Sequence, residues 1–249
     1  MSGPRVSGEA GGLARQPRGL SAAWGRGLGK RARQLSWWAL DYIYAVVWQA
    51  RGVLSRARPA DYRSGDQAPV IILPGIYESW HFMLPLVEAL HSAGHPVHVI
   101  TELRHNRRPV AQGADAVVRY IRQHALSDVV IVAHSKGGLI GKQVMVTEPA
   151  VQSMVAVCTP FSGSRYASFM FLPSLRAFRA SDAGILALRA KEDVNSRIVS
   201  LYGRFDPHIP EGSELPGARN IRIDTGGHFR ILADPATIAA VVRAADDEK

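Results

Sequence analysis

Short hydrophobic runs alternate with longer segments of helical spacing from Pro69 to the C-terminus. The runs are rich in Val and Ile, and turn residues such as Pro74 and Gly75 separate them from the segments that follow. Buried parallel strands read as continuous apolar runs, and helices cover both faces of the sheet that such strands form. The pattern therefore predicts an α/β fold with a mostly parallel sheet of about six strands. The expected strands are 69–73, 96–100, 128–133, 151–158, 195–202 and 220–224, and the expected helices are 80–93, 110–124, 137–147 and 235–245.

Two parts of the chain depart from this rhythm. Residues 160–194 have no strand–helix pattern and are expected to form an insertion over one end of the sheet, either as a lid or as a buried connection. Residues 1–34 are rich in Gly, Arg, Ser and Ala, lack a hydrophobic period, and are expected to be disordered. Residues 35–68 are expected to form a helix and a polar linker, which leaves 69–249 as the α/β domain.

The helix expected after residue 34 is unusually aromatic. Asp41 and Gln49 interrupt its apolar run, so the segment is too short and too polar to span a bilayer. It either packs on the domain or a partner chain, or lies at a membrane interface with its rings at the headgroup level. Its aromatic residues are Trp37, Trp38, Tyr42, Tyr44 and Trp48.

Charge is concentrated at the N-terminus. The net charge is +9, and residues 1–63 hold eleven Lys and Arg against three acidic residues, whereas the remainder holds nineteen basic and eighteen acidic residues. A nearly neutral body argues against a nucleic-acid partner, while the basic arm suggests a solvated tail or contact with an anionic membrane. We expect a cytoplasmic protein, either free or in peripheral contact with the inner face of the membrane through residues 1–60.

The single cysteine, Cys158, excludes an intrachain disulfide and is compatible with a reducing compartment. It lies in an apolar run and is expected to be a small buried side chain. The nine histidines show no metal-ligand spacing, and no cofactor fingerprint is present. We therefore expect neither a metal nor a cofactor.

The strongest chemical signal is the segment Ala133-His134-Ser135-Lys136-Gly137-Gly138. It stands where a fully apolar strand must turn abruptly into a helix, and a serine on such a turn has its hydroxyl pushed clear of the sheet. Ala133 and Gly137 are small, as the close approach of strand and helix requires. Ser135 is the predicted nucleophile, although a serine that only caps the helix is the structural alternative.

A serine hydroxyl needs a base, and the base needs an orienting acid. His228 follows the last expected strand, after two glycines, and Asp206 follows the preceding one. Ligands of open α/β sheets bind at the carboxyl ends of the strands, so these residues are expected to meet Ser135. His208 is expected to line the same loop, and Asp182 and Asp193 are weaker candidates for the acid because neither follows an expected strand.

A tetrahedral intermediate also needs amide donors for its oxyanion. One is expected to be the backbone N–H of Lys136, directly after the nucleophile. The other is expected to be that of Ile76, in the loop after the first strand, where Gly75 allows a tight turn. A simple strand-to-helix turn is the alternative interpretation of that loop.

These motifs together resemble the α/β-hydrolase superfamily, in its lipase and esterase branch, from about Pro69 onwards. The similar segments are VIILPGIYESW, VVIVAHSKGGLIGK, VAVCTPFSGS, YGRFDPHIP and GGHFRIL. The set is also similar to a group of small actinobacterial hydrolases. The resemblance implies a Ser–Asp–His order of triad residues in the chain, matched by Ser135, Asp206 and His228. The chain departs from the family pattern in Ala133 for the first Gly of G-x-S-x-G, in Pro74-Gly75 for the usual His-Gly, and in lacking the first antiparallel strands.

The expected reaction is hydrolysis of carboxylic esters through an acyl-enzyme. A lipid-like or medium-chain acyl group is expected, because the insertion is aromatic. The alternatives are a thioesterase or another acyl-transfer enzyme with the same triad, and a non-catalytic, membrane-associated scaffold that kept the fold. Arg104, Arg107 and Arg108 follow a strand and either bind an anionic group of the substrate or are simply solvated. The residues expected to line the substrate pocket are Tyr77, Phe161, Phe169 and Phe171.

Overall fold

A computed structural model describes the backbone of residues 20–247, and the side chains of residues 34–172 and 174–247. Two compact units are distinguished, Met1–Ser36 and Trp37–Lys249, and the long helix α1 (Leu20–Leu54) contributes residues to both. The segment from Trp37 to residue 68, set apart from the α/β domain in the sequence prediction, lies in the same unit as the sheet.

The strands of the second unit are β1 (Val70–Leu73), β2 (Val97–Val99), β3 (Val129–His134), β4 (Val151–Val157), β5 (Ile198–Phe205) and β6 (Arg219–Gly226). Its helices after α1 are α2 (Leu84–Ser92), α3 (Val110–Gln123), α4 (Lys136–Thr147), α5 (Pro173–Arg176), α6 (Ala183–Arg189) and α7 (Pro235–Asp246). Short 3₁₀ turns are η1 (Pro59–Tyr62), η2 (Trp80–Met83), η3 (Thr101–Leu103), η4 (Arg165–Phe169), η5 (Asn195–Arg197) and η6 (Arg230–Ala233).

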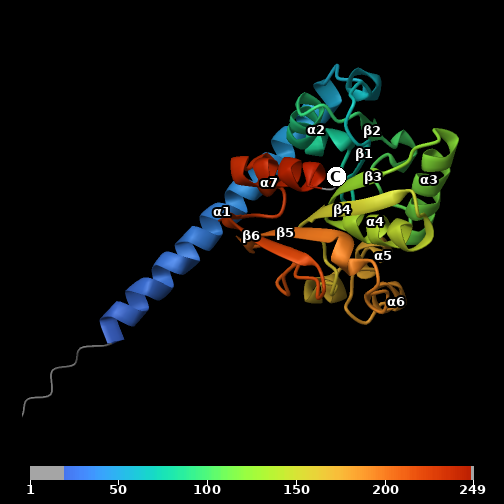
Figure 1. Cartoon of the computed structure of the whole chain (residues 1–249). Coiled ribbons are helices and arrows are strands. Elements are labelled where there is room, and N and C mark those ends of the chain that lie inside the picture. Colours follow the sequence, from blue (N-terminus) through green and yellow to red (C-terminus); the bar gives the residue numbers. More distant parts are fainter. Residues whose placement is uncertain (1–19, 248–249) are drawn as a thin grey trace, which may run out of the picture. The chain divides into compact units, whose positions relative to one another are not determined.

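The strands form one parallel sheet in the order β2-β1-β3-β4-β5-β6, which confirms the predicted α/β fold (Figure 1). Alternate residues of each strand face opposite sides, so the sheet separates two cores. Ile71, Ile131 and Met154 pack with α3, α4 and α6 on one face. Val70, Val130 and Val155 pack with α2 and α7 on the other. The chain runs from β1 outward to β2 and then returns to β3, which leaves the loops after β1 and β3 diverging at the carboxyl edge.

The N-terminal helix begins earlier than the sequence predicts. Disorder was expected over residues 1–34; residues 1–19 lie outside the described residues, and residues 20–34 are the first part of α1. This stretch holds Ala, Leu, Arg, Lys and Gln, which are strong helix formers, and its glycines do not interrupt the helix. In the part of the chain from residue 20 to 247, no helix combines the length and the apolar character that crossing a membrane needs.

The turn from β3 into α4 brings the helix unusually close to the neighbouring strand β1. A Cβ atom at Gly137 would lie 2.0 Å from the carbonyl oxygen of Leu73, which is backbone and has no room to move. Glycine at this position is therefore required by the crossing of α4 over the sheet, and the interior here is packed without slack.

We predict that Gly137→Ala lowers the free energy of unfolding by about 3 kcal/mol, because the added methyl must push α4 away from β1. The measurement is urea denaturation followed by circular dichroism. Gly212→Ala is the control: that glycine has a φ of +82° but open space around its Cβ, so only backbone strain of about 1–2 kcal/mol is expected. Equal effects of the two substitutions would contradict the close approach.

Candidate active site

Ser135 occupies a one-residue turn between β3 and α4. Its backbone has φ 51° and ψ −120°, a region that residues with a Cβ rarely adopt. Such strain, of about 1–3 kcal/mol, persists only where the surroundings enforce it, and here the strand ends at His134 while the helix starts at Lys136. The serine side chain consequently leaves the carboxyl end of the sheet and faces the elements that follow β5 and β6.

The last two strands bring the other two candidates to the same place. β5 and β6 run further than the sequence predicts, and they pair as far as Phe205 and Gly226. Asp206 and the Gly227-His228 segment therefore leave the sheet side by side. Nε2 of His228 lies 3.0 Å from Oγ of Ser135, and Nδ1 of His228 lies 2.8 Å from a carboxylate oxygen of Asp206. The three predicted residues form one hydrogen-bonded chain.

The electrostatics of this chain favour an ion pair between Asp206 and His228. Burial raises the pKa of Asp206, but the charge and hydrogen bond of His228 outweigh it and bring the pKa to about 2. Burial lowers the pKa of His228, but the carboxylate of Asp206, helped by Glu78 and Asp41, raises it above its ordinary value. An imidazolium is therefore stabilised at this position.

The alternative candidates lie elsewhere or have other partners. His208 donates its backbone N–H to Asp206, and burial lowers the pKa of its ring to about 4, which suits a neutral wall residue. Asp182 caps the N-terminus of α6 by accepting the amides of Gly184 and Ile185. Asp193 is exposed.

Cys158 lies next to this hydrogen-bonded chain, directly after β4. Burial, together with the nearby carboxylate of Asp206, raises the pKa of its thiol well above the ordinary value. Among the described residues, Cys158, Asp206 and His228 place one donor atom each within 4.8 Å of one another. Both ring nitrogens of His228 already have hydrogen-bond partners. Zinc binds the thiolate form of cysteine, whereas the raised pKa keeps the thiol of Cys158 protonated. The group therefore fits a hydrogen-bonded cluster better than a metal site.

Three buried side chains that the sequence analysis did not assign to the site hold its backbone in place. Asp41 of α1 accepts the amides of His228, Phe229 and Arg230. Nε2 of His134 lies 2.9 Å from the carbonyl oxygen of His228, and its Nδ1 lies 2.9 Å from Glu78. A charged residue inside an apolar helix was the available signal for Asp41, because a buried carboxylate needs partners.

The two expected oxyanion donors, the amides of Lys136 and Ile76, lie on segments that buried side-chain hydrogen bonds hold in place. Lys136 begins α4, so its amide has no partner within the helix. Its side chain is buried, donates from Nζ to the carbonyl oxygens of Asn106 and Arg108, and has a pKa lowered by burial to about 8. Ile76 lies in the loop after β1, where Glu78 accepts the amide of Gly75 at 2.8 Å.

A cavity of about 460 Å³ opens beside Ser135 and His228. Tyr77 lines it, and the hydroxyl of Tyr77 lies 2.8 Å from that of Ser174. The other three expected pocket residues are not in its wall. Phe161 is buried in the core, whereas Phe169 and Phe171 are 78 % and 97 % exposed. Aromatic composition does not reveal which way a side chain turns. The apolar wall is made by Ile76, Pro160, Ala167, Met170, Leu175, Phe178, Ile209 and Phe229.

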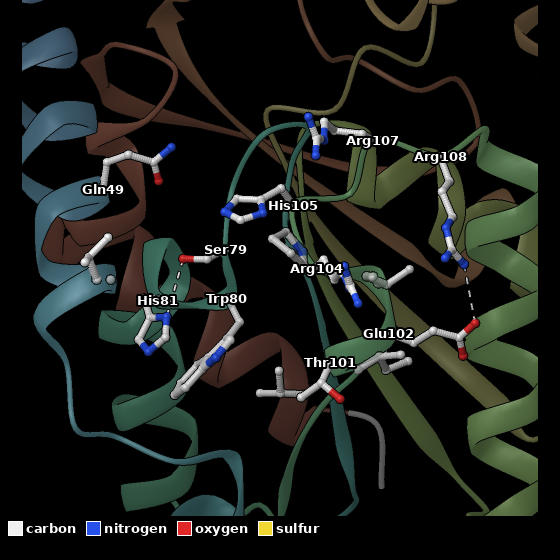
Figure 2. Close-up of a pocket in the computed structure, with 16 residues that line it drawn as sticks. Gln49, Ser79, Trp80, His81, Thr101, Glu102, Arg104, His105, Arg107 and Arg108 are labelled. Atoms are coloured by element: carbon white, nitrogen blue, oxygen red, sulfur yellow. Dashed lines mark hydrogen bonds and ion pairs between the residues drawn. The ribbon is translucent and has the colours of Figure 1, made fainter.

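A second groove of about 1000 Å³ lies on the other side of the loop after β1 (Figure 2). Arg104, Arg107 and Arg108 all line it. Figure 2 shows them spread around the groove, with Arg108 turned towards Glu102, whose carboxylate is 3.5 Å away. They do not converge on one point, as recognition of an anion by several arginines requires.

Comparison with known proteins gives matches in structure only. No family model matches the chain, and no curated protein matches it in sequence. A lipase of Bacillus licheniformis, BlEst2 in its mature form, is similar with a TM-score of 0.59 at 16% identity over 72% of this chain and 92% of that one. Lipase B of Aspergillus fumigatus has a TM-score of 0.60 at 18% identity, over 74% of this chain and 54% of the lipase.

A putative non-heme bromoperoxidase of Mycobacterium tuberculosis, BpoC, is similar to the same degree, with a TM-score of 0.59 at 16% identity over 74% of this chain and 94% of that one. Identities this low establish the architecture and leave the chemistry to the site itself. The parallel sheet, the turn at Ser135 and these neighbours together show that the chain has the α/β-hydrolase fold.

Proposed function

We propose that this protein is a serine hydrolase that cleaves carboxylic esters through an acyl-enzyme. The observation that carries the proposal is the continuous chain from Ser135 through His228 to Asp206, with 3.0 and 2.8 Å between the hydrogen-bonding atoms. In this mechanism His228 takes the proton of Ser135 as Oγ attacks the ester carbonyl, and returns it to the leaving alcohol. Asp206 holds the tautomer of His228 and stabilises the imidazolium.

The surroundings of Ser135 are consistent with an acyl substrate. The negative oxygen of the tetrahedral intermediate would receive the amides of Lys136 and Ile76, and the partial positive charge at the start of α4 favours it further. The apolar wall of the cavity suits an acyl chain, and its volume of about 460 Å³ suits one of medium length. Water then attacks the acyl-enzyme with His228 acting as base again.

We predict that Ser135→Ala abolishes the hydrolysis of p-nitrophenyl esters, with a fall in kcat of about 10⁶-fold, because the nucleophile is lost. The series from acetate to palmitate would also give the preferred chain length. Ser153→Ala, which removes a buried hydroxyl without a hydrogen-bond partner on β4, is the matched control and should retain activity. A fluorophosphonate probe should label the wild type and not Ser135→Ala.

If the wild type neither hydrolyses the esters nor is labelled by the probe, the proposal is overturned and a non-catalytic scaffold is favoured. Labelling without ester hydrolysis would keep Ser135 as nucleophile and redirect the search to thioesters or other acyl donors.

We predict that kcat/KM falls on the acid side of a pH profile as His228 becomes protonated, with a midpoint above the ordinary histidine value. The sign follows from Asp206, which raises the pKa of His228. Asp206→Asn should lower kcat by about 10⁴-fold and move the remaining acid limb to lower pH. Asp193→Asn is the control, since this exposed carboxylate lies outside the hydrogen-bonded chain. An unchanged profile in Asp206→Asn would contradict the assignment of the acid.

We also propose that the outer face of α1 contacts an anionic membrane surface. What supports this is an exposed apolar face made by Ile43, Val46, Val47, Val53 and Leu54, bordered by the partly exposed rings of Trp38 and Tyr42. Charge decides between a bilayer and a second copy of the chain as the occupant. Residues 1–63 carry eleven basic and three acidic side chains, which repel their own copy and attract anionic headgroups.

The full-length protein should co-sediment with vesicles containing anionic lipid and less with neutral ones. The double substitution Ile43→Gln and Val47→Gln should weaken this binding about tenfold by removing apolar area without changing charge. Leu186→Gln, at a comparably exposed apolar residue of α6, is the control. Unchanged binding in the double variant, or a dimer in solution that the double variant dissociates, would overturn the proposal. Deleting residues 1–60 is unsuitable, because it also removes Asp41.

A further inference from the structure

The carboxylate of Asp41, on the N-terminal helix α1, accepts hydrogen bonds from the backbone around His228. Asp41 is completely buried, and its two oxygens accept three successive amides: His228 at 2.8 Å, Phe229 at 2.7 Å and Arg230 at 2.9 Å. The donors belong to the turn directly after β6, where no neighbouring strand continues the ladder. The bond from His228 is buried, and those from Phe229 and Arg230 are partly buried. Without Asp41 the amide of His228 would lose its acceptor, at a cost of about 1–3 kcal/mol for a buried group.

The two glycines before His228 are needed for this contact. A Cβ atom at Gly226 would lie 2.3 Å from the ring of Trp37, and one at Gly227 would lie 2.6 Å from Oδ1 of Asp41. Gly227 also has a φ of +120°, which other residues adopt only under strain. Glycines at 226 and 227 therefore allow α1 to pack closely against the turn that carries His228.

The carbonyl side of His228 is held by a second buried pair. Nε2 of His134 lies 2.9 Å from the carbonyl oxygen of His228, and Glu78 lies 2.9 Å from the other ring nitrogen of His134. Both peptide groups of His228 are thus fixed by side chains from distant parts of the chain. Because its backbone is fixed in this way, the ring of His228 stays within hydrogen-bond distance of both Ser135 and Asp206.

We infer that Asp41 is a positioning residue of the hydrolase, which holds the turn of His228 so that the ring meets Ser135 and Asp206 together. The inference rests on the proposed function. Asp41 does not touch the reacting atoms; it acts through the backbone of His228. A purely structural anchor for α1 needs only apolar packing, and an aspartate in a helix interior is a poor helix former. The role of Asp41 comes from the three backbone hydrogen bonds that its carboxylate accepts.

Small displacements at this point have large effects on rate. A shift of about 1 Å in a reacting group lowers the rate by about a hundredfold. Asparagine is the sharpest replacement for Asp41, because it keeps the shape while turning one acceptor oxygen into a donor that faces an N–H. The turn should move away from the side chain, and the hydrogen bond from His228 to Ser135 should lengthen.

The experiment compares wild type, Asp41→Asn and Leu40→Asn on a water-soluble p-nitrophenyl ester. Leu40→Asn is the control, because it introduces the same residue at an exposed neighbouring position of α1. Asp41→Asn is expected to lower kcat about a hundredfold with little change in KM, and to slow labelling by a fluorophosphonate in parallel. Circular dichroism and the unfolding midpoint establish that the variant is folded.

A pH profile separates positioning from a merely structural role. The charged and titratable groups that face His228 are Asp206 and His208 after β5, His134 on β3, Cys158 after β4, Glu78 after β1 and Asp41 on α1. Asp41 contributes to the raised pKa of His228, so its removal should move the acid limb of kcat/KM to lower pH. A helix anchor alone predicts lower stability with the profile unchanged.

Each outcome can be assigned. Equal kcat and equal pH profiles in Asp41→Asn and wild type would overturn the inference while Ser135-dependent activity still stands. Absence of Ser135-dependent activity in the wild type would instead overturn the proposed function. If Asp41→Asn does not fold, amide hydrogen exchange in the wild type decides. Strong protection of Phe229 and Arg230 is expected, and rapid exchange of these two amides would overturn the inference.

Discussion

The pairing of β5 with β6 is the constraint on which the site depends. Phe205 lies opposite Gly226 at the end of the ladder, so the residues that follow leave the same edge together. A slip of one residue would move one strand end by about 3.3 Å and turn its side chains to the other face of the sheet. Asp206 would then lose His228. Packing on one face fixes this register, because Ile221 and Ile223 of β6 enter the same core as Val199 and Leu201 of β5.

Beyond the ends of the strands, side chains accept the backbone hydrogen bonds that a neighbouring strand would otherwise accept. Carboxylates accept backbone amides in the loops after β1, β5 and β6, which all border Ser135. Asp206 accepts those of His208 and Ile209, Glu78 accepts that of Gly75, and Asp41 accepts those of the turn at His228. Buried amides need partners, and acceptors that carry charge bind them most strongly. The same negative groups raise the pKa of His228, so one set of residues supports both the geometry and the electrostatics.

The features that sequence reasoning could predict depend on local patterns. β1 is a continuous apolar run, and β3 is one up to His134. Ser135 stands at a strand-to-helix turn, and Asp206 and His228 follow later strands, so the order of elements along the chain predicts that all three lie at the carboxyl edge of the sheet. Contacts such as that of Asp41 with His228 join residues 187 positions apart, and no local pattern reports them. The outward direction of Phe169 and Phe171 was unpredictable for a related reason: the stretch that carries them has no period that assigns one side to the core.

Helical geometry explains how α1 carries a buried charge and an apolar outer face at once. Trp37, Asp41, Tyr44 and Trp48 are spaced by four, three and four residues, which places them on one side of a helix. The three aromatic residues are partly buried and Asp41 fully so, and Tyr44 donates to the carbonyl of Phe82. Ile43 and Val47 fall on the other side and are exposed. The spacing turns an apparent break in a hydrophobic run into the polar centre of a packing face. A partner on the outer face therefore leaves the contact with His228 intact.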